Sequence, residues 1–415
     1  MHRFRLGIIG TGKRGTSHLK QILSTMPDVE ITALCDLRAD WLAGAQKLAA
    51  QKGMSPACYT DFRRLIEDPR VEQVLVATSW QTHVRIAVCA LEAGKNVASE
   101  INGASSLEEC WRLVRAQENS AAQYMMLENR CYMRRNMALL NMIRQGLFGQ
   151  VIHCEGGYSH EIRLELATGL ETGHYRIHHF LNRNAEMYPT HELGPICKFL
   201  NINRGNRLLT LCSVASKARG LSEFSARYNG PEHPVSRAEV ACGDIVTTTI
   251  KCAHGETIVL RHDDTLPVPK SFLFMVRGTR GMFSELGNIA SFDRGDGSAH
   301  GPVSSENWDS FEPYMERYEH PLWREFLLSG VEATHDGTDH LLLRAFFDGV
   351  ERGGRMPVDA YDAAAMMSVT CLSEQSVAMG GMPVAIPDFT NGLWLERDSD
   401  PKSRYSLDNV HFDLF

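Results

Sequence analysis

The sequence of 415 residues has no long apolar run, no low-complexity tract and no excess of positive charge. Without an apolar run of membrane-spanning length, a transmembrane helix is not expected. The formal net charge of −7 gives no electrostatic reason to bind nucleic acid or an anionic membrane. Because 43% of the residues are hydrophobic and 22% are charged, we expect a globular protein whose partner is a small molecule.

Paired cysteines are also lacking, since the 11 cysteines are scattered singly and form no Cys-x-x-Cys motif. This pattern predicts reduced, mostly buried thiols. The first residues show neither the apolar stretch nor the cleavage site of a secretory signal, so a cytoplasmic location is expected. The adjacent pair His178-His179 lacks the ligand spacing of a zinc site, and no metal is expected.

A glycine-rich turn follows the first apolar segment. Residues 4–9 lead directly into Gly10-Thr11-Gly12-Lys13-Arg14-Gly15 and then into a helical pattern. In such a turn the first glycine permits the tight bend, the second admits a pyrophosphate, and the third allows close packing of helix and strand. The helix N-terminus then offers free N–H groups to the phosphates.

The segments after this turn continue the pattern of a dinucleotide-binding domain. A second apolar run ends at Asp36, where a carboxylate can bind the adenosine ribose and favour NAD over NADP. The nearby Arg38 counts against this preference. Further strands at 71–78, 96–100 and 122–129 and helices at 83–93 and 106–119 predict a parallel sheet.

The second half of the chain has a different pattern. After a helix at 137–145, most apolar segments resemble strands, which predicts an α+β domain with a large, mostly antiparallel open sheet. These segments are 150–161, 208–217, 244–253, 256–263 and 271–279. We therefore expect an α/β Rossmann domain over 1–127, a substrate-binding α+β domain over 128–396 and a polar C-terminal tail over 397–415.

Several motifs resemble those of the glucose-fructose oxidoreductase / inositol dehydrogenase / MocA family. They are the glycine turn, Asp36, the segment Ala77 to His83, and Gly94-Lys95-Asn96-Val97 leading to Glu100. Dehydrogenases of that family follow the glutamate with a lysine that assists proton transfer, whereas this chain has Ile101-Asn102. A simple alcohol dehydrogenase would therefore need another acid or base.

The closer resemblance is to one branch, glycoside hydrolase family 109, the NAD-dependent α-N-acetylgalactosaminidases, over nearly the whole chain. The matching segments are residues 127–132, 141–149, 188–191, 201–205, 320–323 and 372–376. The resemblance implies tightly bound NAD, transient oxidation of the sugar at C3, elimination across C2 and C1, addition of water and re-reduction. It also implies a homo-oligomer.

The resemblance assigns candidate roles to residues of this chain. The catalytic candidates are His191, Tyr188, Tyr158 and Glu128, and the proton transfers at C2 and C1 stay undivided between Tyr158 and Glu128. The candidates for binding substrate are Arg176, Tyr158, Tyr188, His191 and Lys270. The candidates for binding cofactor are Gly10, Gly12, Lys13, Arg14, Gly15, Asp36, Thr78, Trp80, His83, Glu100, Ile101, Asn129 and Tyr188.

Two departures leave the substrate open. Lys270 stands where the family has a tyrosine expected to contact the sugar, and Glu192 stands where it has a glycine. Neither the sugar nor its anomer follows from the sequence. The alternative hypotheses are a net NAD-dependent sugar or polyol dehydrogenase, disfavoured by the missing lysine, and a non-catalytic NAD-binding regulator, disfavoured by the polar set around Tyr188 and His191.

Overall fold

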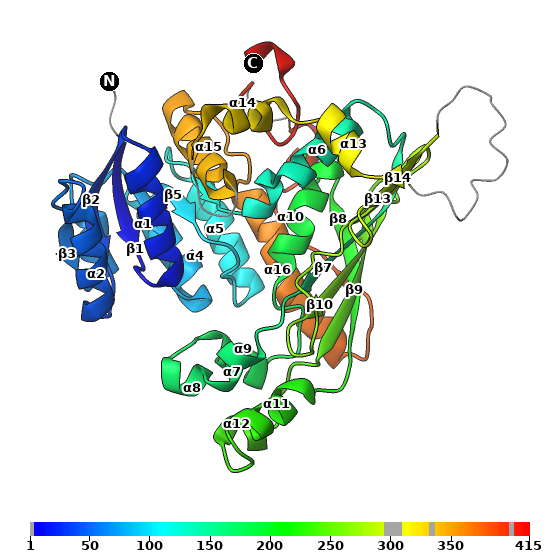
Figure 1. Cartoon of the computed structure of the whole chain (residues 1–415), viewed down its shortest axis with the longest axis horizontal. Helices are drawn as coiled ribbons and strands as arrows, with labels where there is room; N and C mark the ends of the chain where they lie inside the picture. Colours follow the sequence, from blue (N-terminus) through cyan, green and yellow to red (C-terminus); the bar gives the residue numbers. More distant parts are fainter. Residues whose placement is uncertain (1–3, 294–308, 332–336, 398–401) are drawn as a thin grey trace. The chain divides into compact units, whose positions relative to one another are not determined.

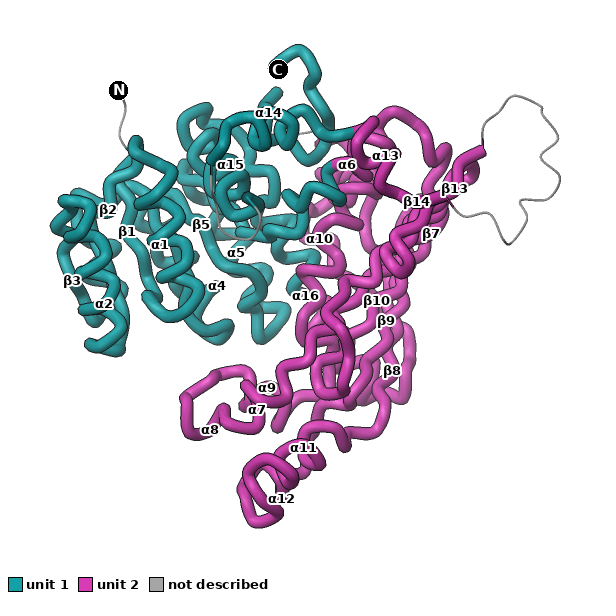
Figure 2. The backbone as a smooth tube through the Cα atoms, in the orientation of Figure 1, with its two compact units in different colours: residues 1–137, 319–367, 398–415 teal, residues 138–318, 368–397 magenta. Residues whose placement is uncertain are grey.

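The computed structural model describes residues 4–293, 309–331, 337–397 and 402–415 (Figure 1). The chain forms two compact units (Figure 2). Unit 1 comprises 1–137, 319–367 and 398–415, and unit 2 comprises 138–318 and 368–397. This division differs from the predicted domains, because the segment 319–367 and the C-terminal tail belong to the same unit as the N-terminal sheet.

Unit 1 is built on a parallel sheet of six strands in the order β3-β2-β1-β4-β5-β6. This is the order of a dinucleotide-binding fold, whose ligands lie at the carboxyl ends of the strands where the order reverses, here between β1 and β4. The strands are β1 (Phe4–Ile9), β2 (Val29–Cys35), β3 (Ala57–Tyr59), β4 (Gln73–Val76), β5 (Asn96–Ser99) and β6 (Tyr124–Met126).

Helices connect these strands, and the later segments of unit 1 add further helices. They are α1 (Lys13–Thr25), α2 (Ala39–Ala50), α3 (Phe62–Glu67), α4 (Trp80–Glu92), α5 (Leu107–Glu118), η1 (Asn129–Tyr132), α14 (Pro321–Ser329), α15 (Thr338–Arg352) and η4 (Phe412–Leu414). The division between units falls within α6 (Arg134–Arg144) and α16 (Ala360–Ala378). In the described part of the chain, no helix has the length and apolar character needed to cross a bilayer.

Unit 2 is built on a mixed sheet of nine strands in the order β14-β13-β12-β11-β7-β10-β9-β8-β15. All its neighbouring strands are antiparallel except β7 and β10, so the predicted fold class is confirmed. The strands are β7 (Val151–Ser159), β8 (Leu208–Ala215), β9 (Ile245–Cys252), β10 (Thr257–Asp263), β11 (Met275–Gly278), β12 (Gly281–Ser284), β13 (Ile289–Phe292), β14 (Asp309–Ser310) and β15 (Val384–Ala385).

Unit 2 contains an apolar cluster that supports the polar residues discussed below. Residues such as Ile177, Phe180 and Met187 pack with Leu166 and Val246 in this cluster. The helices are α7 (Arg163–Ala167), α8 (Gly169–Thr172), α9 (Arg176–Asn182), α10 (Pro189–Phe199), α11 (Gly220–Tyr228), α12 (Pro234–Arg237), α13 (Glu312–Arg317) and η3 (Leu393–Leu395).

Several predicted boundaries were wrong. The helix predicted at 137–145 is α6, which begins at Arg134, and the strand predicted at 122–129 is β6, which spans only Tyr124–Met126. Helix α4 begins at Trp80 rather than His83, because the polar residues of its first turn hide the apolar period, and Thr82 Oγ1 donates to Ser79 O at 2.9 Å. The strand predicted from residue 271 begins only at Met275, because Leu273 has a φ of 50° and interrupts the extended backbone.

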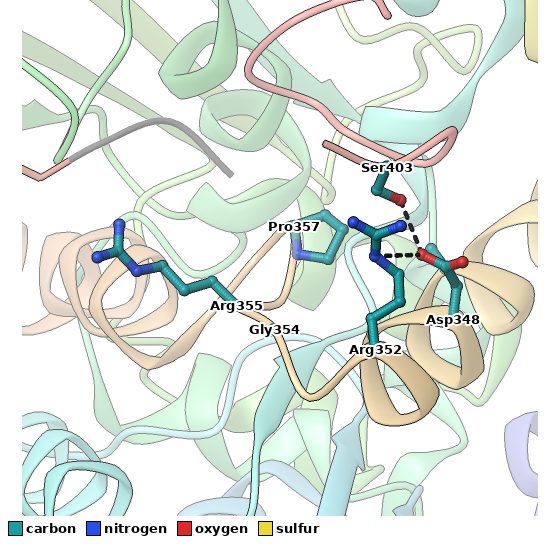
Figure 3. A pocket seen from close by; sticks show the side chains of 8 residues that line it. Asp348, Arg352, Gly354, Arg355, Pro357 and Ser403 are labelled. Atoms are coloured by element: carbon teal, nitrogen blue, oxygen red, sulfur yellow. Dashed lines mark hydrogen bonds and ion pairs between the residues drawn. The ribbon is translucent and has the colours of Figure 1, made fainter. Parts of the chain in front are cut away.

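The C-terminal tail packs on α15 within unit 1. Ser403 Oγ donates to Asp348 Oδ2 at 2.8 Å, and Arg352 Nε lies 3.8 Å from the same oxygen (Figure 3). Pro357 and Gly354 line the crevice beside them, whose volume of about 10 Å³ corresponds to roughly one water. The crevice is too small for a sugar or a nucleotide.

Candidate functional site

The glycine turn lies at the carboxyl ends of β1 and β4, where this fold binds dinucleotides. Gly10 has a φ of 93°, and a Cβ there would lie 2.5 Å from Ala77 O. A Cβ on Gly15 would lie 1.9 Å from Gly10 O, so α1 approaches the turn closely only because residue 15 is glycine. Gly12 is the N-cap of α1, and a Cβ on Gly12 would lie 2.7 Å from the Trp41 ring. Lys13 is the first residue of α1 and is exposed.

Asp36 follows β2 and is tied to the same turn. Its Oδ2 accepts from Thr11 N at 2.6 Å, and its Oδ1 accepts from Arg38 N at 2.9 Å. The Arg38 guanidinium is bonded to Asp40. The carboxylate is thus fixed beside the glycine turn, and the three glycines allow the close backbone packing that this turn requires, so these residues fit a bound NAD.

Glu100 joins a charged network within unit 1 instead of standing alone beside the turn. Arg14 Nε donates to Glu100 Oε1 at 2.7 Å, and the Arg14 Nη atoms donate to both oxygens of the buried Asp339 at 2.6 and 2.8 Å. His18 Nε2 lies 2.6 Å from Glu100 Oε1. Burial alone would raise the pKa of Glu100, but Arg14 and His18 outweigh it and lower that pKa to about 2.

The other cofactor candidates of unit 1 lie at the ends of β4, β5 and β6. Trp80 and Ile101 are buried, and Thr78 Oγ1 lies 2.7 Å from Thr82 Oγ1. His83 Nε2 lies 3.0 Å from Thr78 O, and burial lowers the pKa of this imidazole, so it is neutral at pH 7.

Glu128 and Asn129 begin the short helix η1. Glu128 Oε1 accepts from the backbone N–H of Arg130 at 3.0 Å, so the carboxylate caps η1. Asn129 Nδ2 donates to Asp339 Oδ1 at 3.2 Å, which joins this residue to the Arg14 network.

In unit 2, three of the predicted catalytic residues form one aromatic cluster. Tyr158 is the penultimate residue of β7, Tyr188 is the N-cap of α10, and His191 lies in the first turn of α10. The Tyr158 and Tyr188 rings stack with centroids 4.0 Å apart and planes 6° apart. The His191 ring lies 5.0 Å from Tyr188 and 5.6 Å from Tyr158, and Phe272 packs against both Tyr158 and His191.

Arg176, the first residue of α9, belongs to the same cluster. Its Nη2 donates to the Tyr188 hydroxyl at 3.0 Å, and its guanidinium carbon lies 4.8 Å from the centre of the Tyr188 ring. Burial opposes the charge, but the surrounding tyrosines raise the pKa of Arg176 well above its usual value. The cluster therefore contains a permanent cation beside the Tyr188 oxygen.

The sequence reasoning missed His160, two residues after Tyr158. Its Nδ1 lies 2.7 Å from the Tyr158 hydroxyl oxygen, and its ring meets the Tyr158 ring edge-on at 5.4 Å. Lys270 is exposed, and its charge is close enough to lower the pKa of His160. The spacing of alternate residues on a strand would have placed His160 on the same face as Tyr158.

Glu192 is fully buried and packs against β7 and β10. Its Oε2 accepts from Arg261 N at 3.2 Å, and its carboxyl interacts electrostatically with that of Glu186, whose Oε1 accepts from Tyr188 N at 3.0 Å. Burial raises the pKa of both carboxyls, and the proximity of Glu186 raises that of Glu192 further. Burial and the nearby Glu186 carboxyl thus favour the protonated form of Glu192, the residue that replaces the family's glycine, beneath the turn that carries Tyr188.

No metal-binding cluster of three or more His, Cys, Asp or Glu side chains occurs within the described ranges.

The fold, the glycine turn and the fixed Asp36 define an NAD-binding protein of the oxidoreductase type. Residues 4–128 match the oxidoreductase family with an NAD-binding Rossmann fold, and residues 132–396 match the C-terminal domain of glycosyl hydrolase 109. The chain belongs to glycosyl hydrolase family 109.

Similar proteins agree with this assignment. A glycosyl hydrolase family 109 protein of Stenotrophomonas maltophilia is 36% identical over 420 residues, covering 95% of this chain and 91% of the relative. An alpha-N-acetylgalactosaminidase of Tannerella forsythia is 37% identical over 417 residues, covering 95% and 87%. The family, the enzyme class and the NAD cofactor predicted from the sequence are confirmed.

Solved structures share the fold. A levoglucosan dehydrogenase in complex with NADH aligns with a TM-score of 0.69 and 20% identity, covering 93% of this chain and 99% of that one. This likeness concerns the architecture, while the chain itself is an NAD-dependent glycosidase by family.

Proposed function

We propose that this enzyme hydrolyses glycosides of the N-acetylgalactosaminide class and keeps its NAD through each turnover. The observation that supports this most is the single cluster of Tyr158, Tyr188, His191 and Arg176, found in a chain of glycosyl hydrolase family 109. Bound NAD supplies a transient oxidation at C3 of the sugar, which makes the proton on C2 acidic.

In this proposal the candidate residues have separate roles in proton transfer and in substrate binding. His191 accepts the proton of the C3 hydroxyl, and Tyr188 donates a hydrogen bond to the C3 oxygen. Arg176 orients the sugar and stabilises negative charge on that oxygen. Lys270 contacts a substituent of the sugar, and Tyr158 and Glu128 serve the proton transfers at C2 and C1.

The residues of unit 1 hold the cofactor in this proposal. Gly10, Gly12, Lys13, Arg14 and Gly15 accommodate the pyrophosphate, and Asp36 binds the adenosine ribose. Around the rest of the cofactor we place Thr78, Trp80, His83, Glu100, Ile101, Asn129 and Tyr188. We further propose a cytoplasmic location and a homo-oligomer.

The test is an assay of the purified enzyme on aryl α- and β-N-acetylgalactosaminides with no added NAD. We expect many turnovers of aglycone release without accumulation of NADH, together with entry of solvent deuterium at C2. A dehydrogenase would instead release no aglycone and would accumulate NADH from free sugars with added NAD. That result would overturn the proposal.

A further inference from the structure

The two stacked tyrosines carry different partners on their hydroxyl groups. The Tyr158 hydroxyl is bonded to His160 Nδ1 at 2.7 Å, whereas the Tyr188 hydroxyl is bonded to Arg176 Nη2 at 3.0 Å. A guanidinium has no acceptor atom, so Tyr188 cannot pass its proton to Arg176. An unprotonated imidazole nitrogen can accept a proton, so Tyr158 has a neighbour that can take its own.

The surroundings of His160 keep the imidazole in the accepting form. Burial lowers the pKa of His160, and the positive charges of Lys270 and Arg176 lower it further. Asp264 and Glu165 face the same side chain and oppose this change, but the net direction is downward. At neutral pH the ring is therefore uncharged, and its Nδ1 can receive the hydrogen bond of the phenol.

The backbone fixes this pair. The partner of Tyr158 across the parallel ladder is His262, and His160 N donates to Asp263 O at 3.0 Å immediately beyond the strand. On the other side of β7, Gly157 N donates to Phe272 O at 2.6 Å. The hydrogen bonds to Asp263 on one side and to Phe272 on the other thus fix the backbone at the end of β7. This backbone determines how the Tyr158 phenol is oriented toward the His160 imidazole.

We propose that His160 is the proton acceptor of Tyr158 and that the two together remove the C2 proton of the oxidised sugar. This inference rests on the proposed function. In the step, the C2–H bond breaks, its proton goes to the Tyr158 oxygen, and the original phenol proton goes to His160 Nδ1. The electron pair stays on the sugar as an enolate with the C3 oxygen, and the imidazole becomes an imidazolium. His160 acts through Tyr158, so it is a positioning residue.

The first test compares His160→Asn with His153→Asn. Asparagine can accept the hydrogen bond of the phenol but cannot take its proton. His153 is a matched control, because it lies on β7, the strand that His160 follows, and its Nδ1 lies 2.7 Å from the hydroxyl of Thr257. At neutral pH we expect His160→Asn to slow aglycone release and C2 deuterium exchange by roughly 100-fold or more, and His153→Asn to leave both unchanged.

The pH profile separates proton transfer from packing. In His160→Asn the rate should keep rising with pH, because without His160 the phenol must lose its proton to solvent before it can act as a base, whereas the wild-type rate should level off earlier. Added imidazole should restore part of the activity of His160→Ala. A His160→Asn enzyme with wild-type exchange and an unchanged pH profile would overturn the inference.

A measurement on the protein without sugar gives an independent readout. Nitrogen NMR of labelled histidine should show His160 with an unprotonated, hydrogen-bonded Nδ1, and this signal should shift in Tyr158→Phe. A protonated Nδ1 would overturn the inference while leaving the proposed function intact. If the wild-type enzyme neither releases aglycone nor exchanges the C2 proton, the proposed function fails, and the inference with it.

Discussion

The rings of Tyr158 and Tyr188 lie nearly parallel with centroids 4.0 Å apart, although Tyr158 lies near the end of a strand and Tyr188 caps a helix. Phenylalanine at either position keeps the stacked ring and removes only the hydroxyl. We expect Tyr158→Phe and Tyr188→Phe each to lower kcat by about 100-fold or more with little change in Tm. The control is Tyr228→Phe, an exposed tyrosine stacked on Phe224, which should keep full activity. Equal activity in all three variants would contradict the catalytic assignment.

Gly15 should be indispensable for NAD binding. A Cβ at this position would lie 1.9 Å from Gly10 O, so Gly15→Ala must push α1 away from the turn. We expect the purified variant to contain less than about a tenth of the wild-type NAD, since misplaced N–H groups lose their phosphate contacts. Gly44→Ala, also in a helix but with open space around it, should retain its NAD and gain up to about 1 kcal/mol. Full NAD content in Gly15→Ala would refute this placement.

Glu192 should make stability depend on pH. Its pKa in the folded protein is raised above the usual 4.5, so its contribution to stability is complete below that value and is lost as pH rises through the folded pKa. Glu192→Gln keeps a neutral donor, and its Tm should exceed that of the wild type by a margin that grows from about pH 5 to pH 8.

Urea or thermal unfolding across that range measures the margin, and Glu223→Gln, at an exposed position on α11, is the control. Parallel curves for wild type and Glu192→Gln would mean that the carboxyl is ionised in the folded protein.

Asp339 should contribute strongly to the stability of unit 1. Its buried carboxylate accepts two bonds from Arg14 and one from Asn129, so Asp339→Asn removes the charged bidentate partner of Arg14 and leaves Glu100 as the counter-charge described above. We expect a loss of about 3 kcal/mol, seen as a lower urea midpoint. Asp40→Asn removes the same kind of bidentate partner from the exposed Arg38 and should leave the midpoint unchanged. A small effect at both positions would show that water reaches Arg14.

The local pattern of the sequence predicted five of the six strands of the first sheet. The apolar runs and the glycine turn indicate these strands, because their residues are mostly buried and each helix follows its strand directly. Strand β3 (Ala57–Tyr59) was not predicted, because it has only three residues and none of them is buried. The start of α4 was misplaced because its first turn is polar, and such a turn looks like a loop when only apolar spacing is read.

Contacts between residues far apart in the chain could not be predicted from local sequence patterns. Arg14 and Asp339 are 325 positions apart, and no pattern in either segment indicates that the two side chains pair. The family motifs indicated Tyr158, Tyr188, His191 and Arg176, but the stacking of the two phenols depends on how β7 and α10 meet in the fold. His160 lies two residues after Tyr158, so strand periodicity could have placed it on the same face, although no motif marks it.

The one parallel pair in the second sheet has a consequence for how this family can diversify. Because β7 and β10 run in the same direction, the segment after Asp263 leaves beside His160, and it returns at Ser271 to pair with Ser159 across β7. The connection that carries Lys270 is therefore anchored at both ends on the strand of Tyr158 and unconstrained by the ladder between them. Because the charge of Lys270 also lowers the pKa of His160, a substitution of this residue would change the proposed contact with the sugar and the proton acceptor together, so substrate range and catalytic competence are coupled.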